Sequence, residues 1–357
     1  MIFTSFVQKG LIIYCLSLSI NGFAQDSLRT RKIKVLPVPA LGYAPETKTY
    51  FGAVALFTIN LYQDTNTRSS VAKFEVNYTQ LKQLIIETEW NYFFKKEKWF
   101  TQGLLHYSIY PDLYYGIGSQ TLESSKTSFQ SNRFKTEMSV LKKIQENWFA
   151  GVGIRYFDYS HISTLNSPNT FTELHRNTSY GIQLNAVRDA RNNILTPTKG
   201  SYFRALNNHS VSTSYYSHIS VDYRKYITLG KKIKQTLSSR VYSTHVIGNA
   251  PFYDLALLGG DKLVRGYYFG RFRDKNLSTV QFEYRACLFW RIGIAAFGGL
   301  SSVYSNLNDV GVNKVKTNYG VGLRFVVDKK ERTNLRFDYA IGQNGQTGFY
   351  VSFGESF

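Results

Sequence analysis

One stretch of the chain, LGGDKLVRGYYFGRFRD (258–274), gathers the residues best suited to ion pairing. It contains three arginines, two aspartates and four aromatic residues, interspersed with glycines. An arginine offers a planar fork of donors that pairs with a carboxylate through two parallel hydrogen bonds. A buried guanidinium needs such partners to offset the loss of its hydration. Because the stretch has neither the strand period nor the helix period, it predicts a long loop held by charge pairs.

Residues typical of catalysis or metal binding form no comparable group. The histidines are scattered over the chain at His106, His161, His175, His209, His218 and His245. The segment YSHIS occurs at 159–163 and again at 216–220, so a Ser/His pair is conceivable, but no Asp or Asn stands at a supporting spacing. No cluster has the spacing of metal ligands, and no helix follows the glycines of GYYFGR as a phosphate loop requires. We expect no enzyme, no metal and no cofactor.

The segments on both sides of this loop alternate between apolar and polar residues, which is the period of a strand. In QFEYRACLF, Phe282 and Glu283 fall on opposite faces, as do Phe337 and Asp338 in LRFDYAI. A soluble sandwich would alternate in the same way, but the predicted strands run about 10–15 residues, which is long for a sandwich. The chain also combines 16% aromatic residues with a mean hydropathy of −0.25. We therefore expect an all-β fold, a transmembrane antiparallel β-barrel whose strands meet lipid on one face and water on the other.

Counting the alternating segments predicts about sixteen strands. Their expected boundaries are 32–43, 47–62, 70–82, 84–95, 98–110, 128–143, 146–160, 177–189, 200–213, 214–229, 231–247, 277–289, 291–304, 317–328, 332–342 and 346–357. Connections after even strands should be periplasmic turns, and they are short and charged, as in KKEK (95–98). Connections after odd strands should be outer loops, and they include the long segments 111–127, 161–176, 248–276 and 305–316. The stretch 258–274 then lies in the sixth and longest outer loop, 248–276.

The first 24 residues have the form of a secretory signal peptide, with a short apolar run followed by Ala24 at the cleavage site. Cys15 lies within this run without the small residues that precede a lipoprotein cysteine. Cleavage would leave residues 25–357 as one barrel domain. Its single cysteine, Cys287, excludes an internal disulfide.

The chain is strongly basic, with 43 Lys and Arg against 24 Asp and Glu. Such a balance is common in proteins that bind nucleic acid, but the export signal argues against that class of partner. We therefore expect that the protein does not bind nucleic acid. We expect instead that the barrel lies in the outer membrane of a Gram-negative bacterium and contacts lipid there.

Four segments resemble the BamA/TamA superfamily, also called the bacterial surface antigen family. The core of the loop, Val264-Arg265-Gly266-Tyr267, is similar to that family's sixth-loop signature. DARNNILTPTKG resembles the family's D-x-R-x-N…P-x-x-G segment, and the matching residues are Asp189, Arg191, Asn193, Pro197 and Gly200. LPVPALGYAPETKTYFGA (36–53) and the closing hairpin at 335–357 are similar to the ends of the family's shorter members. The resemblance thus covers the whole chain after the signal peptide.

The resemblance implies that the sixth outer loop folds back into the barrel lumen and that Arg265 meets acidic residues on the inner wall. Alternation points Glu283 and Asp338 inward, so we predict that Arg265 pairs with one or both. Family members usually carry another Asp in an F-x-D-x-G segment where this chain has Gly299, so the lock would be weaker or rebuilt around Asp338. Arg265 is either a structural tether or takes a direct part in moving a client.

Two further features bear on function. The segment 189–200 is most simply a turn between two strands, since its Pro and Gly are standard turn residues. Phe353 and Phe357 lie at period two near the end of the chain, which fits either a barrel's C-terminal assembly signal or an ordinary last strand. Family members that assemble or secrete proteins carry periplasmic POTRA domains, and no segment before residue 32 could form one. A client would then be captured by a separate periplasmic partner, or not at all.

The expected function is to assist the insertion or translocation of protein or lipid clients at the outer membrane. The first and last strands would form a weak seam, because glycines near 345–348 and 354 loosen the last strand. The alternative is a passive pore or structural barrel that has kept the fold and lost the assembly activity.

Overall fold

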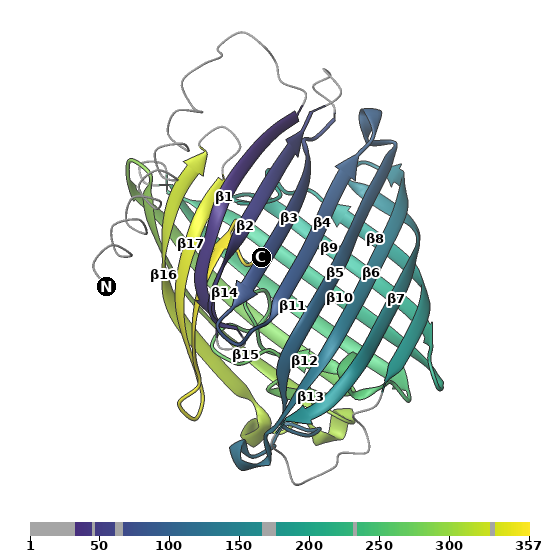
Figure 1. Ribbon diagram of the computed structural model, residues 1–357. Helices are drawn as coiled ribbons and strands as arrows, with labels where there is room; N and C mark the ends of the chain where they lie inside the picture. The colour runs from purple at the N-terminus through teal and green to yellow at the C-terminus, as the bar shows by residue number, and fades with distance from the viewer. Residues whose placement is uncertain (1–32, 45–46, 61–66, 166–175, 231–233, 329–332) are drawn as a thin grey trace, which may run out of the picture.

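In the computed structural model, one antiparallel sheet of sixteen strands curls around a central space (Figure 1). The structure describes residues 33–44, 47–60, 67–165, 176–230, 234–328 and 333–357. The predicted signal peptide, residues 1–24, lies outside the described residues. Among them, no helix is long and apolar enough to cross a membrane.

The strands follow one another around the sheet in chain order, each antiparallel to its neighbours. They are β1 (Ile33–Ala44), β2 (Lys48–Ile59), β3 (Ser70–Thr79), β4 (Leu84–Phe93), β5 (Trp99–Tyr114), β6 (Thr127–Gln145), β7 (Trp148–Leu165), β8 (Asn177–Asp189), β9 (Gly200–Val211), β10 (Tyr215–Leu229), β11 (Gln235–Gly248), β14 (Asn276–Phe289), β15 (Ile292–Tyr304), β16 (Lys316–Asp328), β17 (Thr333–Gly342) and β18 (Thr347–Phe353). The predicted barrel fold is confirmed, and each strand begins within four residues of its expected start.

Two predictions about strands are corrected. The sixth loop itself contains two short strands, β12 (Ala256–Leu258) and β13 (Phe272–Asp274), which pair with each other and were not expected. Three residues are too few to show a period of two. The last strand ends at Phe353 rather than at 357, because Gly354 adopts a φ of +76° and turns the chain away from the sheet. Short 3-10 helices occupy other connections: η1 (Lys95–Glu97), η2 (Glu123–Ser125), η3 (Phe252–Asp254), η4 (Leu307–Asp309) and η5 (Val312–Lys314).

The two faces of the sheet differ as the alternation predicts. On β14, Gln281 and Glu283 point inward and are buried, whereas Phe282 between them is 54% exposed on the outer face. The same contrast recurs on β16, where Val321 and Leu323 are exposed and Arg324 is buried. The outer face is therefore apolar and suited to lipid, and the polar inner face needs internal partners.

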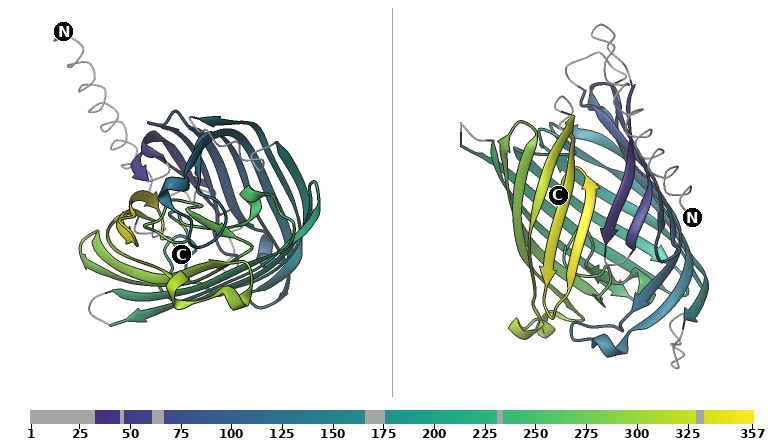
Figure 2. Two further views of the ribbon diagram at one scale, coloured as in Figure 1. Left: turned by 90° about the horizontal axis from the view of Figure 1, so that it is seen from below. Right: turned by 60° about the vertical axis from the view of Figure 1, so that its left-hand side comes forward.

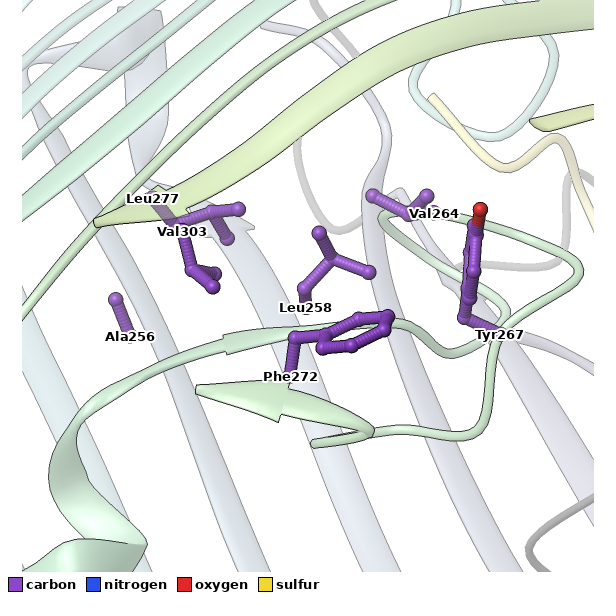
Figure 3. Close-up of a cluster of buried hydrophobic side chains, with 7 residues drawn as sticks. All are labelled: Ala256, Leu258, Val264, Tyr267, Phe272, Leu277 and Val303. Atoms are coloured by element: carbon purple, nitrogen blue, oxygen red, sulfur yellow. The ribbon is translucent and has the colours of Figure 1, made fainter. Parts of the chain in front are cut away.

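The sixth outer loop, which connects β11 to β14, lies inside the barrel (Figure 2, left). It has a small apolar core of its own against the wall, and Figure 3 shows the residues of that core: Ala256, Leu258, Val264, Tyr267, Phe272, Leu277 and Val303. Leu277 and Val303 come from β14 and β15, so the loop is packed against the strands that follow it. This packing fixes the position of the arginine in the loop signature.

Candidate functional site: the inward loop and the seam

Arg265 lies between two carboxylates of the inner wall. Its Nη2 donates to Oε2 of Glu283 on β14 at 2.6 Å, and its Nη1 donates to Asp338 on β17. The guanidinium also stacks on the ring of Phe297 on β15, with Cζ 3.4 Å from the ring centroid. Arg265 is 2% exposed and both carboxylates are fully buried, so the pairs are shielded from water and ions. The structure thus brings together the three residues that the sequence singled out.

These pairs belong to a larger cluster of four arginines and four carboxylates, whose side chains are all buried except that of Asp261, which is partly exposed. Its members are Arg265, Arg285, Arg324 and Arg336 with Asp261, Glu283, Asp338 and Glu355. Asp338 accepts from three of the arginines, with Arg324 Nη1 at 2.5 Å and Arg336 Nη1 at 2.7 Å. The charges balance within the cluster, which is what allows so many ions to be buried together.

The position of the family's further Asp is filled by an amide network in this chain. Gly299 on β15 stands opposite Gln281 on β14. A Cβ on Gly299 would lie only 2.2 Å from Nε2 of Gln281, so the Gln281 side chain occupies the space above the glycine. That amide in turn donates to Oδ1 of Asn318 at 3.2 Å. Arg265 therefore has two carboxylates and an aromatic ring as partners instead of a third carboxylate.

The other residues of the loop signature also have specific positions. Gly266 has a φ of +101°, and its N–H donates to the hydroxyl of Tyr350 on β18 at 3.0 Å. A Cβ there would come within 2.9 Å of the backbone of Ile341, so only glycine fits this close approach. The Tyr267 hydroxyl donates to the carbonyl of Thr317 at 2.7 Å. Val264 is fully buried in the loop's apolar core.

Three further anchors tie the same loop to other walls of the barrel. Asp254 receives Arg155 of β7, with Nη1 to Oδ2 at 2.6 Å. The Tyr268 hydroxyl donates to Asp112 of β5 at 2.5 Å, and Lys262 Nζ forms an ion pair with Glu89 of β4. Sequence analysis missed these pairs, because their members are 99 to 173 positions apart and carry no motif. The one available signal was Asp254, because a carboxylate within an otherwise apolar loop segment needs a charged or hydrogen-bonding partner.

The predicted turn motif, 189–200, is a tightly bonded connection between β8 and β9. Asp189 accepts from Arg191 through Nε at 2.9 Å and Nη2 at 2.8 Å. Oδ1 of Asn193 accepts the N–H of Thr196 at 2.7 Å. Gly200 has a φ of +106°, and the Pro197 carbonyl accepts from Arg285 at 3.1 Å. The turn is thereby linked to the buried arginine cluster, which sequence analysis did not anticipate.

The end of the chain also turns inward, which corrects the expected alternation through Phe357. Phe353 is the last residue of β18, while Phe357 is buried and its carbonyl accepts from Arg285 Nη2 at 2.8 Å. Between them, Oε2 of Glu355 accepts from Arg324 Nε at 2.8 Å, and the N–H of Glu355 donates to the carbonyl of Leu195. Phe353 and Phe357 therefore do not share one strand face.

The seam between β1 and β18 is the one break in the ladder of the described strands. The two strands lie side by side (Figure 2, right) but no pairing register joins them. Instead, Lys34 of β1 pairs with Asp328 of β16, and Leu36 packs in a cluster that includes Phe353. The Tyr50 hydroxyl, on β2, donates to the carbonyl of Val351 at 2.8 Å.

Two prolines on the free edge of β1 account for the missing hydrogen-bonded ladder between β1 and β18. Alternate residues of an antiparallel strand bond to opposite neighbours. The N–H of Gln80 donates to the carbonyl of Thr49, so odd-numbered residues of β2 bond to β3 and even-numbered ones to β1. Through the β1–β2 register, the odd-numbered residues of β1 then face the seam, and these include Pro37 and Pro39. Proline has no N–H, so the centre of this edge lacks two donors.

A cavity of about 740 Å³ remains between the loop and the walls formed by β2 to β11 and β18. Its lining carries both signs of charge, with Glu87, Arg133 and Asp222 on the strands and Lys262 on the loop. In the described part of the chain, two histidines have a serine hydroxyl on one ring nitrogen and an oxygen acceptor on the other. His106 lies 3.0 Å from Oε2 of Glu87 and 3.1 Å from the Ser108 hydroxyl, and His245 lies 3.0 Å from the Ser243 hydroxyl and 2.9 Å from Oδ1 of Asn276. Nδ1 of His209 lies 2.8 Å from the Ser217 hydroxyl on the exposed surface, with no carboxylate bonded to the ring. No group of His, Cys, Asp and Glu there could hold a metal ion.

Comparison with known proteins agrees with the sixteen-stranded barrel. The profile of the Omp85 superfamily domain matches residues 49–357. The chain belongs to the Omp85 superfamily. This membership confirms the resemblance to BamA/TamA-type barrels. An Omp85 barrel is a component of the Gram-negative outer membrane, so the short turns of the barrel face the periplasm.

Two solved structures are similar to this Omp85 barrel. BamA from Haemophilus ducreyi lacking POTRA domains 1-3 superposes with a TM-score of 0.58 at 13% sequence identity, over 91% of this chain and 70% of that one. CdiB from Acinetobacter baumannii gives the same TM-score and identity, over 90% of this chain and 60% of that one. At this identity the likeness concerns the fold alone. No curated protein matches the sequence.

Proposed function

We propose that this Omp85 barrel assists the insertion or translocation of protein or lipid clients at the outer membrane, through its β1–β18 seam. The open seam is the main support. Every other neighbouring pair of strands in the sixteen-stranded sheet is joined by a backbone ladder, whereas this pair is held by apolar packing and by side chains that bridge to the adjoining strands. In hydrocarbon each unpaired backbone group costs several kcal/mol. An edge left unpaired there therefore tends to pair with the strand of another chain or to disturb the lipid around it.

The contacts across the seam are made by side chains, so they can be broken without unfolding the barrel. Among the described residues, the contacts include an ion pair, a hydrogen bond and an apolar cluster. The Lys34 side chain is 39% exposed, and exposed ion pairs contribute little to stability. Opening of the seam would expose the edges of β1 and β18 to the bilayer and would thin the bilayer next to them. Delivery of a client to this site would be the task of a separate periplasmic partner.

A reversible crosslink across the seam tests the proposal. In a Cys287→Ser background, Lys34→Cys and Asp328→Cys would be joined by a short, cleavable bismaleimide, because the two side chains meet across the seam. A deletion strain carrying this variant should lose one or a few outer-membrane proteins from its outer-membrane proteome after crosslinking. Cleaving the linker should restore them.

The matched control joins two strands that a ladder already connects. Asp158→Cys and Thr178→Cys stand opposite each other on β7 and β8, so crosslinking them leaves the seam untouched. The control strain should keep its normal outer-membrane proteome. An unchanged proteome in both crosslinked strains would refute the seam as the working part of the protein.

The cavity of about 740 Å³ favours a second candidate function, a passive pore. A pore would conduct ions steadily in the wild type and would not need the seam. Deletion would then change the permeability of the outer membrane to small solutes and leave the outer-membrane proteome intact.

A further inference from the structure

A groove of about 520 Å³ lies on the outside of the barrel at its periplasmic end, where β5 begins and β6 ends. It is lined by Lys98, Trp99, Lys142, Lys143, Ile144, Gln145 and Glu146. Trp99 and Lys142 stand directly opposite each other in the β5–β6 register, and Lys142 Nζ lies 6.0 Å from the centroid of the indole ring. The N–H of Lys143 donates to the carbonyl of Lys98 at 3.0 Å, which ties the two turns together.

The groove faces the membrane rather than the lumen. Phe100 and Leu141, the neighbours of Trp99 and Lys142, point inward and are almost fully buried. Their outward neighbours continue as an apolar stripe through Val140 and Met138. The stripe therefore ends at the periplasmic rim with a tryptophan and lysines, the residue types that sit at a membrane interface.

The lysines around this groove have few acidic partners. In the described part of the chain, no carboxylate lies within 4.0 Å of Lys95, Lys96, Lys98 or Lys142. The nearest acid of the β4–β5 turn, Glu97, is buried, accepts from Arg68 at 2.8 and 3.1 Å, and lies 4.0 Å from Lys143 Nζ, so it pairs with only one lysine of the groove. Glu146 is the single exposed carboxylate of the lining. The rim thus carries a local excess of positive charge that the protein itself does not neutralise.

We propose that this groove binds the headgroup of an anionic phospholipid of the periplasmic leaflet. The phosphate would lie among Lys98, Lys142 and Lys143, and the acyl chains would lie along Trp99 and Ile144, which are 45% and 66% exposed. Basic groups at the membrane surface attract anionic lipid, and a basic pocket next to an apolar wall selects it over a neutral one. This site is independent of the seam and of the proposed insertion activity.

The test compares lipid binding by the purified, folded barrel in detergent micelles, measured by native mass spectrometry. The probes are dioleoylphosphatidylglycerol and the neutral dioleoylphosphatidylcholine. The wild type should prefer the anionic lipid, and Lys98→Gln with Lys142→Gln and Lys143→Gln should lower that preference about tenfold or more, since each lysine contributes a few-fold to the attraction. The control removes the same charge from the opposite rim through Lys82→Gln, Lys126→Gln and Lys275→Gln, and should keep the preference.

Quenching of tryptophan fluorescence by brominated phosphatidylglycerol locates the lipid. Trp99→Phe should remove much of the quenching, while the groove variant should quench equally with anionic and neutral brominated lipids. Equal lipid preference in the groove variant and the wild type would overturn the proposal. So would an acidic peptide such as polyglutamate that binds the groove in place of the lipid, because the rim would then be a docking surface for a protein.

Discussion

At the scale of single residues, the inward loop is held by charges that are shared rather than paired one to one. Asp338 accepts from Arg265, Arg324 and Arg336, while Glu283 accepts from Arg265 and Arg285. Removing one arginine leaves each carboxylate with another cation. Removing Asp338 takes one acceptor from three buried guanidinium groups at once, although each keeps another carboxylate. Loss of the acid should therefore cost more than loss of the arginine in the loop signature.

We expect Asp338→Asn to destabilise the barrel by about 3–5 kcal/mol, because three buried ion pairs lose their anion and the cluster keeps one positive charge in excess. Arg265→Gln should cost less, because Arg265 takes part in two buried ion pairs and Asp338 in three. The measurement is urea unfolding of the barrel in micelles, followed by tryptophan fluorescence and by the gel shift of the folded form. Equal losses for the two variants would mean that the cluster does not share its charges.

The anchor at Asp254 makes docking of the loop depend on pH. Burial works to raise the pKa of Asp254, but Arg155 and the other donors hold that pKa below its ordinary value. A depressed pKa stabilises the docked loop above the pKa of the free carboxyl, about 3.9. This contribution is lost as the pH falls through the lower, docked pKa.

Hydrogen exchange of the loop amides, corrected for the intrinsic pH dependence, should therefore show a rise below about pH 4 that depends on Asp254. Asp254→Asn should exchange faster at neutral pH and lack the acid transition. An acid transition that persists in this variant would show that other carboxylates control the loop.

At the scale of elements, the edge strands differ in the backbone donors that they present. The free edge of β1 lacks donors at Pro37 and Pro39. The free edge of β18 keeps its N–H groups. The N–H of Gly354 donates to Asn334 and that of Gly342 donates to Gln346, so the even-numbered residues of β18 bond to β17. The backbone groups of the odd-numbered residues, such as Val351, therefore point toward the seam. The prolines thus keep the seam from closing into a full ladder.

The double variant Pro37→Val and Pro39→Val should close the seam. It restores two donors, so β1 and β18 can form ladder bonds worth about 1–3 kcal/mol in total. The barrel should resist urea to a higher concentration, and insertion activity should fall. Leu41→Val at the same edge raises strand propensity without adding a donor and serves as the control. A double variant with unchanged stability would show that the prolines do not keep the seam apart.

At the scale of the whole molecule, the sixth loop links opposite walls of the barrel. Arg265 ties it to β14 and β17, Asp254 ties it to β7, and Lys262 ties it to β4. The loop therefore braces the barrel from within and also blocks part of its lumen. Because the anchors lie on different walls, no single one of them decides whether the loop stays inside.

Conductance in planar bilayers should show this redundancy. The wild type and the single variants Arg265→Ala and Asp254→Ala should conduct little, while the double variant should open to a larger and more frequent conductance. A single Arg265→Ala as conductive as the double variant would make Arg265 the sole lock. Steady conductance in the wild type would favour the passive pore.

The sequence by itself determined the barrel, because a strand with lipid outside and water inside must alternate at every position. It also determined which acids could meet Arg265, since alternation places Glu283 and Asp338 on the inner face. Only the tertiary structure decided the anchors at Asp254 and Lys262, which join residues far apart in the chain. The edge role of Pro37 and Pro39 likewise depends on register, which a single strand does not encode. Local periods follow from backbone geometry, whereas contacts across the lumen follow from closure of the whole sheet.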